Sequence, residues 1–364
     1  MKIAFFTPES SDGSGSSRFR ATQFFETFAA EGIECKFIPF VNEGLKRYYF
    51  KPGVGAAILK AFFFFLAFLR RFIDVFKAVD CDLVFIHRNI VPIGPELFAF
   101  IVKFLLRKPI VYDFDDAIYL SFTSRANTYI KWVKANHLRT RQNIRLADVV
   151  IAGNRTLADL ARQFNQNVKI IPTVVDLSKD TYRIVERPAG DRKITIGWTG
   201  SYGTTLYIDV VRQPLLELLK RFPDLQVILL GYTGDLRVDR LSAVRWDLES
   251  EKASLAQFDI GINPLPDTPF TRGKCGFKII QYMALGIPSV VSPVGANADI
   301  LEDGKQGFWA RSDEEWLEKL SLLIQDVSLR TRLGRAARER AENIYSINAV
   351  KGKYLEIFSE VCEK

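Results

Sequence analysis

The sequence has little of what disulfide-stapled or metal-centred proteins are built from. Its four cysteines are scattered without CxxC or zinc-ligand spacing, and it has only two histidines. A disulfide framework and a metal site made of His and Cys are therefore not expected. Reduced thiols in a cytoplasm are the simplest interpretation of these cysteines.

Long apolar runs are missing as well. The most hydrophobic stretch, Ala61 to Leu69, is bounded by Lys60 on one side and by Arg70 and Arg71 on the other. A bilayer core of about 30 Å needs roughly 20 apolar residues, so this stretch is too short to span it. The opening MKIAFF leads directly into a proline and a polar loop, which is not the pattern of a signal peptide. The sequence thus predicts a cytoplasmic protein without a spanning helix.

The length, composition and charge of the chain indicate its domain number and the kinds of partner it can bind. A chain of 364 residues suits two domains, and 48% hydrophobic with 25% charged residues is typical of an ordinary folded protein. The formal net charge of +8 favours an anionic partner, such as a nucleotide or a membrane surface. Nucleic acid is not expected, because no nucleic-acid-binding motif accompanies the charge.

The chain opens with the pattern of a nucleotide-binding α/β domain. Residues 2 to 8 predict a buried strand, a Gly- and Ser-rich loop follows, and a helix is predicted from Phe19 to about Glu31. The dinucleotide fingerprint is incomplete, because an arginine stands at the third glycine position. A plain turn and a loop that binds an acceptor or a phosphate both fit this pattern. The candidate residues of such a loop are Gly13, Ser14, Gly15, Arg18 and Arg20.

Residues 42 to 79 form a basic and aromatic insert. In AAILKAFFFFLAFLRRFIDVFKAV, apolar side chains surround much of the predicted helix, and lysines and arginines are interspersed. Two interpretations stay open. The helix can pack its phenylalanines inside the domain, or it can lie on an anionic membrane with phenylalanines at the headgroup boundary.

Three acidic residues, Asp113, Asp115 and Asp116, cluster where the strand predicted over Pro109 to Phe114 ends. Ligands of open α/β sheets bind beyond the carboxyl ends of the strands. Three acids this close repel one another unless cations, hydroxyl groups or protonation relieve them. Helix capping by Asp115 or Asp116 is the alternative. His87, at the end of its own predicted strand, fits a structural role as well as a functional one.

The second half of the chain is organised around residues 258 to 295. A buried strand, a loop, a helix that begins near Gly276 and Phe277, and a second buried strand form a βαβ unit. The loop and the helix start carry Arg272, Lys274 and Lys278. Free N–H groups and the positive end of the helix dipole favour an anion there, so we expect a phosphate site.

The same stretch resembles the donor-binding segment of glycosyltransferase family 4, and the resemblance extends over nearly the whole chain. MALGIPSVVSPVG fits the second half of the family motif, but its two Glu positions read Gly273 and Gln281. The resemblance implies a GT-B fold, with two Rossmann-like α/β domains facing each other across a cleft. It also implies that Gln281 holds the ribose hydroxyls, since an amide both donates and accepts. In the family the earlier Glu usually contacts the donor sugar. Gly273 lacks this carboxylate, so the identity of the donor sugar stays open.

The resemblance assigns further roles. It implies that the positively charged residues named above stabilise the departing diphosphate with Lys278 foremost, and that Asp115 or Asp116 faces the sugar or acceptor. The loop GWTGSYGTT lacks the family's Arg and Lys, so its backbone N–H groups are expected to assist. The resemblance places Trp246 and Arg245 at the nucleobase; a tryptophan at the end of a strand can equally belong to the core. The implied donor-binding residues are Gly200, Ser201, Tyr202, Arg245, Trp246, Gly276, Phe277 and Gln281.

The sequence also predicts the domain plan. We expect an acceptor-binding domain over residues 1–180, a linker over 181–192, a donor domain over 193–345, and a helix over 346–364 that packs back on the first domain. The apolar spacing of the last helix supports that docking.

The implied activity is retaining transfer, of the hexosyltransferase type, from a nucleoside-diphosphate sugar to a hydroxyl of a sugar or lipid-linked acceptor. It would serve bacterial cell-surface polysaccharide, lipopolysaccharide or lipid-linked glycan synthesis. No metal or other cofactor is expected, although Asp113 and Asp115 have Asp-x-Asp spacing. An anionic membrane, at the inner face of the cytoplasmic membrane, is a partner the composition allows. Two alternatives stay open: a nucleotide-sugar epimerase of the same fold, and a non-catalytic protein that binds nucleotide sugars or a membrane.

Overall fold

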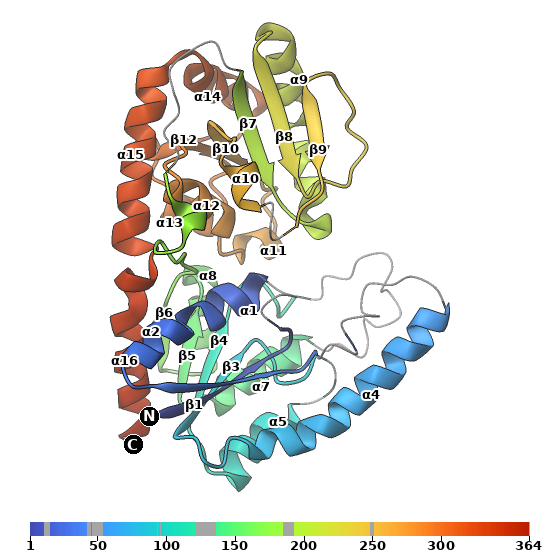
Figure 1. The fold of residues 1–364 in the computed structure, drawn as a ribbon, viewed down its shortest axis with the longest axis vertical. Coiled ribbons are helices and arrows are strands. Elements are labelled where there is room, and N and C mark those ends of the chain that lie inside the picture. Colours follow the sequence, from blue (N-terminus) through green and yellow to red (C-terminus); the bar gives the residue numbers. More distant parts are fainter. Residues whose placement is uncertain are drawn as a thin grey trace. The chain divides into compact units, whose positions relative to one another are not determined.

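The computed structural model describes residues 1–10, 15–41, 45, 54–92, 94, 96–120, 136–184, 193–247 and 251–363. The chain divides into two compact units. Unit 1 comprises Met1–Thr173 and Val350–Lys364, and unit 2 comprises Val174–Ala349. The ribbon is shown in Figure 1. Gly13, Ser14, part of the insert and residues 185–192 of the predicted linker lie outside the described residues.

Unit 1 contains a parallel sheet, which in the described part of the chain has six strands in the order β2-β1-β3-β4-β5-β6. The central strands are buried along their whole length, because nearly every side chain in them is apolar. The strands are β1 (Lys2–Thr7), β2 (Glu34–Pro39), β3 (Leu83–His87), β4 (Ile110–Phe114), β5 (Val149–Ala152) and β6 (Val168–Ile170).

The helices of unit 1 are more broken than the sequence predicts. The single helix expected from Phe19 to about Glu31 is three pieces, and it starts earlier, at Gly15. The helix before β4 is a short α-helix that continues as a π-helix. The described elements are α1 (Gly15–Arg20), the 3-10 turn η1 (Thr22–Phe24), α2 (Phe25–Ala30), α4 (Val54–Phe76), α5 (Leu97–Phe100), the π-helix η2 (Ile101–Leu105), α7 (Asn136–Leu146), α8 (Arg155–Arg162) and α16 (Ile347–Cys362).

The last helix, α16, completes the core of unit 1 from Val350 onward. The ring centroid of Tyr354 lies 4.8 Å from that of Phe24, and that of Phe358 lies 5.4 Å from that of Phe28. Both residues of α16 are fully buried or nearly so. The hydrophobic core of unit 1 therefore depends on residues from the two ends of the chain.

Unit 2 repeats the architecture with a second parallel sheet, in the order β12-β11-β10-β7-β8-β9 over the residues described. Its strands are β7 (Ile194–Thr199), β8 (Leu225–Leu230), β9 (Leu241–Val244), β10 (Ile260–Asn263), β11 (Ser289–Val291) and β12 (Gly307–Trp309). Its helical elements are η4 (Asp180–Tyr182), η5 (Tyr202–Val211), α9 (Arg212–Arg221), α10 (Glu251–Leu255), α11 (Pro269–Arg272), α12 (Phe277–Ala284), α13 (Ala296–Ile300), α14 (Asp313–Gln325) and α15 (Val327–Ile344).

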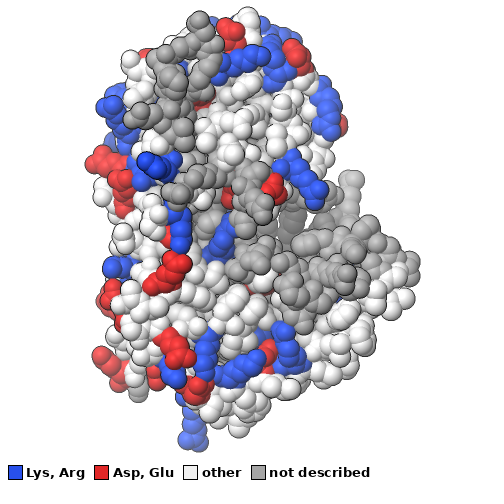
Figure 2. Space-filling view, viewed as in Figure 1, with Lys and Arg blue, Asp and Glu red and all other residues white. Residues whose placement is uncertain are grey.

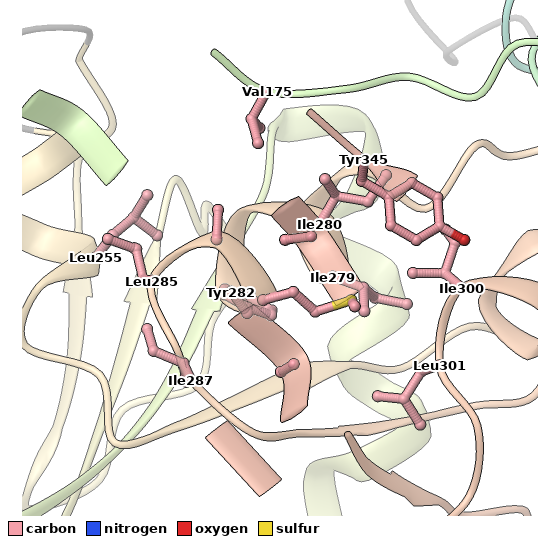
Figure 3. Packing of buried hydrophobic residues seen from close by; sticks show 14 of the residues in the cluster. Val175, Leu255, Ile279, Ile280, Tyr282, Leu285, Ile287, Ile300, Leu301 and Tyr345 are labelled. Atoms are coloured by element: carbon pink, nitrogen blue, oxygen red, sulfur yellow. The ribbon is translucent and has the colours of Figure 1, made fainter. Parts of the chain in front are cut away.

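Helix α12 is the buried centre of unit 2. Figure 3 shows its residues Ile279, Ile280 and Tyr282 among apolar side chains from α10, α13 and the loop before β11. Tyr345 and Val175 belong to the same cluster, and Val175 N–H donates to the Tyr345 carbonyl over 2.9 Å. The segment after Thr173 thus packs in unit 2, whereas the sequence analysis extended the first domain to residue 180.

The fold class expected from the sequence is confirmed: two Rossmann-like α/β units, each with a parallel sheet. Among the helices of the described ranges, none is long and apolar enough to cross a membrane.

Candidate functional site

Each sheet has one point where the strand order reverses. In unit 1 the chain goes from β1 outward to β2 and then returns to β3 on the other side of β1. In unit 2 it goes from β7 outward to β8 and β9 and then returns to β10 on the other side of β7. Such switch points open a crevice at the carboxyl ends of the strands, where ligands of this architecture bind. In unit 1 the chain after β1 leads to α1, and β3 ends at His87; in unit 2 Trp198 lies near the end of β7, and α12 follows β10.

In unit 2, the start of α12 is built by a glycine. Gly276 precedes the helix with a φ of 63°, in the left-handed region that favours glycine. A Cβ at this position would lie 2.3 Å from Cδ1 of Ile300, so the neighbouring helix also excludes a side chain. The first turn of α12, from Phe277, therefore presents its backbone and the positive end of its dipole where the sequence analysis expected an anion.

Lys278 and Lys274 flank this helix start. The Lys278 ammonium lies 4.5 Å from the ring centroid of Trp198, the fully buried residue near the carboxyl end of β7. The Lys274 ammonium lies 5.2 Å and 5.9 Å from the ring centroids of Phe270 and Tyr207. Contact with an aromatic face orients an ammonium group without removing its charge. Both lysines are therefore suited to stabilise a phosphate.

Arg272 is placed differently. Its guanidinium forms a two-pronged ion pair with Asp267, with Nε 2.6 Å from Oδ1 and Nη2 3.0 Å from Oδ2. Both side chains are more than half exposed. The pair raises the pKa of Arg272 and lowers that of Asp267 through their mutual hydrogen bond. An anionic ligand would have to compete with Asp267 for this arginine.

The loop after β7 uses part of its hydrogen-bonding capacity internally. Gly200 N–H donates to the Leu230 carbonyl over 2.9 Å, and Ser201 N–H donates to Oγ1 of Thr204 over 2.9 Å. The sequence analysis expected N–H groups from this loop to meet the diphosphate. In this structure the first N–H extends the pairing of β7 with β8 and the second closes the start of η5, the 3-10 helix that Tyr202 begins.

A carboxylate that the sequence analysis missed connects two of its candidate residues. Glu251, at the start of α10 and buried, accepts from Nε1 of Trp246 over 3.2 Å and from Nε2 of Gln281 over 3.3 Å. Gln281 is 3% exposed and also donates to the Tyr182 hydroxyl over 3.4 Å. Trp246 keeps 39% of its surface exposed, so it is not a core residue, and Arg245 beside it is exposed too.

In unit 1, Asp113 of the acidic cluster forms a buried ion pair with Arg20. Arg20 contacts both oxygens of Asp113 and donates to the Ile171 carbonyl over 2.8 Å. Arg20 is 1% exposed, so it organises the site from the core, whereas the sequence analysis assigned it to a ligand loop. Burial alone would lower the pKa of Arg20, but Asp113 outweighs it and raises the pKa above its usual value.

A chain of polar contacts leads from this pair toward the surface. His87 Nδ1 lies 2.7 Å from Oδ2 of Asp113, and its Nε2 lies 2.8 Å from Oγ of Ser16. Ser16 donates to Oδ2 of Asp115 over 2.6 Å, and Arg88 Nε donates to Oδ1 of the same carboxylate over 2.5 Å. His87 is completely buried and Ser16 is half-buried. The sequence analysis did not single out Ser16 or Arg88.

The charges in this cluster are compensated. Burial alone would raise the pKa of Asp115, but Arg88, His87 and Arg20 together hold it well below its usual range. Arg88 and Asp116 both have positive φ, 59° and 55°, which non-glycine residues rarely adopt. Such strain persists where the surroundings fix the backbone, and it gathers at functional sites. Because its pKa is lowered, Asp115 stays ionised beside the hydroxyl of Ser16.

The remaining residues of the predicted loop are partly defined. Gly15 begins α1, and the Arg18 guanidinium lies 4.5 Å from the ring centroid of Phe19. Asp113 is unsuited to bind a metal with Asp115, because Arg20 and His87 occupy its oxygens in a fully buried setting. The structure thus brings Asp115 together with Ser16, His87 and Arg88, and it separates Arg20 from any exposed surface.

Residues 194–326 match the family model for "Glycosyl transferases group 1". This range lies within unit 2. The matched range contains Lys274, Lys278, Gln281 and Glu251, the residues gathered around the start of α12 and the buried carboxylate. A curated relative, spore coat protein SA of Bacillus subtilis (strain 168), is 28% identical over 83 residues, which are 22% of this chain and 22% of that protein.

Solved structures with the same fold cover almost the whole chain. The Anabaena HepE structure in complex with UDP and glucose has a TM-score of 0.63 and 16% identity, and covers 99% of this chain and 100% of its own. Sucrose-phosphate synthase from Thermosynechococcus elongatus has a TM-score of 0.70 and 15% identity, covering 99% and 98%. The lipopolysaccharide outer core galactosyltransferase WaaB has a TM-score of 0.61 and 16% identity, covering 99% and 100%. These matches establish the GT-B fold.

Proposed function

We propose that this protein is a retaining glycosyltransferase that moves a sugar from a nucleoside-diphosphate sugar to an acceptor hydroxyl. The observation that carries the proposal is the match of residues 194–326 to the group 1 glycosyltransferase model, within which Lys278, in the first turn of α12, contacts Trp198 near the carboxyl end of β7. A site built from backbone amides and cations at a helix start suits a diphosphate.

The difficult step of such a reaction is the departure of the diphosphate, on which negative charge develops. Cations that are already in place stabilise this charge without the reorganisation that water would need. In the proposed mechanism Lys278 and Lys274 meet the diphosphate, and Arg272 joins them when a ligand displaces Asp267. The backbone at Gly276 and Phe277 contacts the phosphate farthest from the nucleoside. No metal is required, because these residues supply the positive charge.

The nucleoside is assigned to the cluster around Glu251. A buried carboxylate next to an amide can accept hydrogen bonds from two neighbouring hydroxyls of a ribose. Trp246, which is partly exposed and bound to Glu251 through its indole N–H, offers a flat surface to the base, with Arg245 beside it. HepE has been crystallised with UDP-glucose, which makes a uridine nucleotide the first donor to test.

The acceptor or transferred sugar is assigned to Asp115 and Ser16. An ionised carboxylate accepts hydrogen bonds from sugar hydroxyls, and Ser16, whose hydroxyl lies between His87 and Asp115, can donate or accept. Arg88, which donates to Asp115, and Asp116 beside it both have positive φ. The group that removes the acceptor proton is not assigned to a side chain.

The proposed setting is the synthesis of a bacterial cell-surface polysaccharide, lipopolysaccharide or lipid-linked glycan, at the cytoplasmic side of a membrane. The similarity to a lipopolysaccharide galactosyltransferase and to a spore coat protein supports this setting. The basic and aromatic insert supports an acceptor that is presented at a membrane.

The test combines binding and transfer. Thermal shift with a panel of nucleotide sugars that includes UDP-glucose should show stabilisation by at least one of them, because ligand binding to the folded state raises the melting temperature. Incubation of that donor with candidate acceptors should yield a glycoside with the anomeric configuration of the donor. An inverted product would contradict retention alone. Isomerisation of the donor would indicate an epimerase, and binding without transfer to any acceptor or to water would indicate a binding protein.

A further inference from the structure

Helix α4 packs against the sheet of unit 1 through one narrow stripe. Ala67, Arg71, Asp74 and Val75 are buried at the spacing of one helix face. Arg71 donates to the Ile38 carbonyl over 3.0 Å, and its guanidinium lies 5.3 Å and 5.4 Å from the ring centroids of Phe6 and Phe40. The inward face of α4 therefore packs in the core of unit 1.

The outward face of α4 is apolar as well, with the same helical spacing. Phe65 is 57% exposed and Ile73 is 70% exposed. Soluble proteins expose single apolar side chains freely, but a continuous patch this long marks an interaction surface. The exposed apolar residues of this face are Ile58, Phe62, Phe65, Leu69, Ile73 and Phe76.

The apolar surface continues onto a second element. Figure 1 shows α5 beside α4, and the ring centroid of Phe98 lies 4.9 Å from that of Phe72 and 5.5 Å from that of Phe68. The π-helix that follows α5 exposes Phe104 by 64%. In Figure 2 the described atoms over α4, at the lower right, are almost all white, which marks uncharged residues. The two helices thus pack against each other through buried Phe98, and we call their exposed apolar residues together the α4–α5 face.

The charges along the α4–α5 face are mainly positive. Outside its buried stripe, helix α4 carries Lys60 and Arg70, and its single acid, Asp74, is buried and pairs with Arg70 and Lys77. The sequence after the π-helix continues with a further arginine, Arg107, which is exposed, and a lysine. A surface that is apolar at its centre and cationic along its rim is complementary to an anionic lipid bilayer.

We propose that the α4–α5 face docks on an anionic phospholipid bilayer, with α4 lying in the plane of the headgroups. This inference rests on the proposed function, to which it adds the membrane as a partner. A helix of 23 residues with four charged side chains lies on a membrane and does not cross it. A second copy of the chain fits less well, because two cationic rims would repel each other. Lipid docking would hold unit 1 at the surface where a lipid-linked acceptor is found.

The test is co-sedimentation of the full-length protein with vesicles of phosphatidylcholine, alone and mixed with phosphatidylglycerol. The wild type should bind the mixed vesicles. The double variant Phe62→Ser and Phe65→Ser should bind them at least about tenfold more weakly, because two side chains that enter the headgroup boundary are lost. The double variant Lys60→Gln and Arg107→Gln should lose most of the preference for phosphatidylglycerol, since each surface cation contributes roughly fivefold.

The matched control is Leu322→Ser with Val327→Ser, which removes two exposed apolar side chains of unit 2 and should bind vesicles like the wild type. All these variants should keep the melting temperature and the transfer to a soluble acceptor without vesicles. If no protein transfers sugar, the wild type included, but the wild type still binds the mixed vesicles, the proposed function fails and the docking stands. A wild type that ignores mixed vesicles overturns the docking. If the wild type instead forms a dimer, and the Phe62→Ser and Phe65→Ser variant is a monomer, the face binds a second copy of the chain and the docking is also overturned.

Discussion

The Lys278 ammonium lies 4.5 Å from the ring centroid of Trp198, at the carboxyl end of the strand where unit 2 reverses its strand order. The lysine comes from the first turn of α12 and the tryptophan from β7, so two elements that are distant in the sequence fix one cation. Removal of this ammonium would leave the tryptophan and the helix start in place.

We predict that Lys278→Ala lowers the turnover of sugar transfer by on the order of 100-fold, the usual size of losing one charge-stabilising group. Nucleotide affinity should fall much less, because the developing charge is greatest during departure of the diphosphate. Initial rates and calorimetric binding of the donor nucleotide measure the two effects. Lys319→Ala is the matched control, since its ammonium lies 5.5 Å from the ring centroid of Phe308 on another part of unit 2. Near-normal turnover in Lys278→Ala would remove this lysine from the mechanism.

We predict that Glu251→Gln weakens nucleotide binding by about 10- to 100-fold, because a hydrogen bond to a charged group contributes roughly 1.5–3 kcal/mol. The amide keeps the size of the side chain, so the contacts of Trp246 and Gln281 should persist in part. Titration of the protein with UDP measures the effect. Glu318→Gln, which changes an exposed acid, should bind UDP like the wild type. Equal affinity in Glu251→Gln would assign the ribose elsewhere.

We predict that Asp115→Asn lowers transfer by about 10- to 100-fold while UDP affinity is unchanged, since the carboxylate belongs to unit 1 and its charge-assisted hydrogen bonds are lost. Donor binding and initial rates separate the two outcomes. Asp80→Asn is the control, because Asp80 is an exposed acid of the same unit that pairs with Lys36. Weakened UDP binding with unchanged turnover would contradict the assignment of Asp115 to the acceptor or sugar.

A buried ion pair in unit 1 predicts a pH dependence of stability. Glu96 is 2% exposed, and burial raises its pKa to about 7 although Arg139 lies 2.7 Å away. Because the folded state binds this proton more tightly than the unfolded state, the Glu96 contribution is fully present below about pH 4.5 and falls as pH rises to about 7. Glu96→Gln should flatten this part of the profile of melting temperature against pH. An unchanged profile would mean that Glu96 is ionised in the folded protein throughout this range.

The fold was predictable because its signals are local. Runs of buried β-branched and aromatic residues predict the strands, and the spacing of the apolar side chains on α12 and α16 predicts the faces that they bury. Asn154 caps α8 by accepting from the Leu157 N–H, as its type and position indicate. The glycine and the lysines around the start of α12 also follow from a short stretch of sequence.

The site residues that sequence analysis missed depend on contacts between distant positions. Ser16 meets Asp115 across 99 residues, and Glu251 meets Gln281 across 30. Local spacing does not encode such a pair. The same reason explains Arg20: its position in a helix next to a glycine-rich loop indicates a ligand, but its partner, Asp113, is 93 residues away and holds it in the core.

The division of the chain has a consequence for engineering. Unit 2 is one uninterrupted piece, Val174–Ala349, whereas unit 1 is closed by Val350–Lys364 after that piece. A truncation before Val350 would strip Tyr354 and Phe358 from Phe24 and Phe28 and leave that apolar surface bare. Exchange of donor specificity between relatives is therefore best designed as replacement of an internal cassette that keeps both outer segments together.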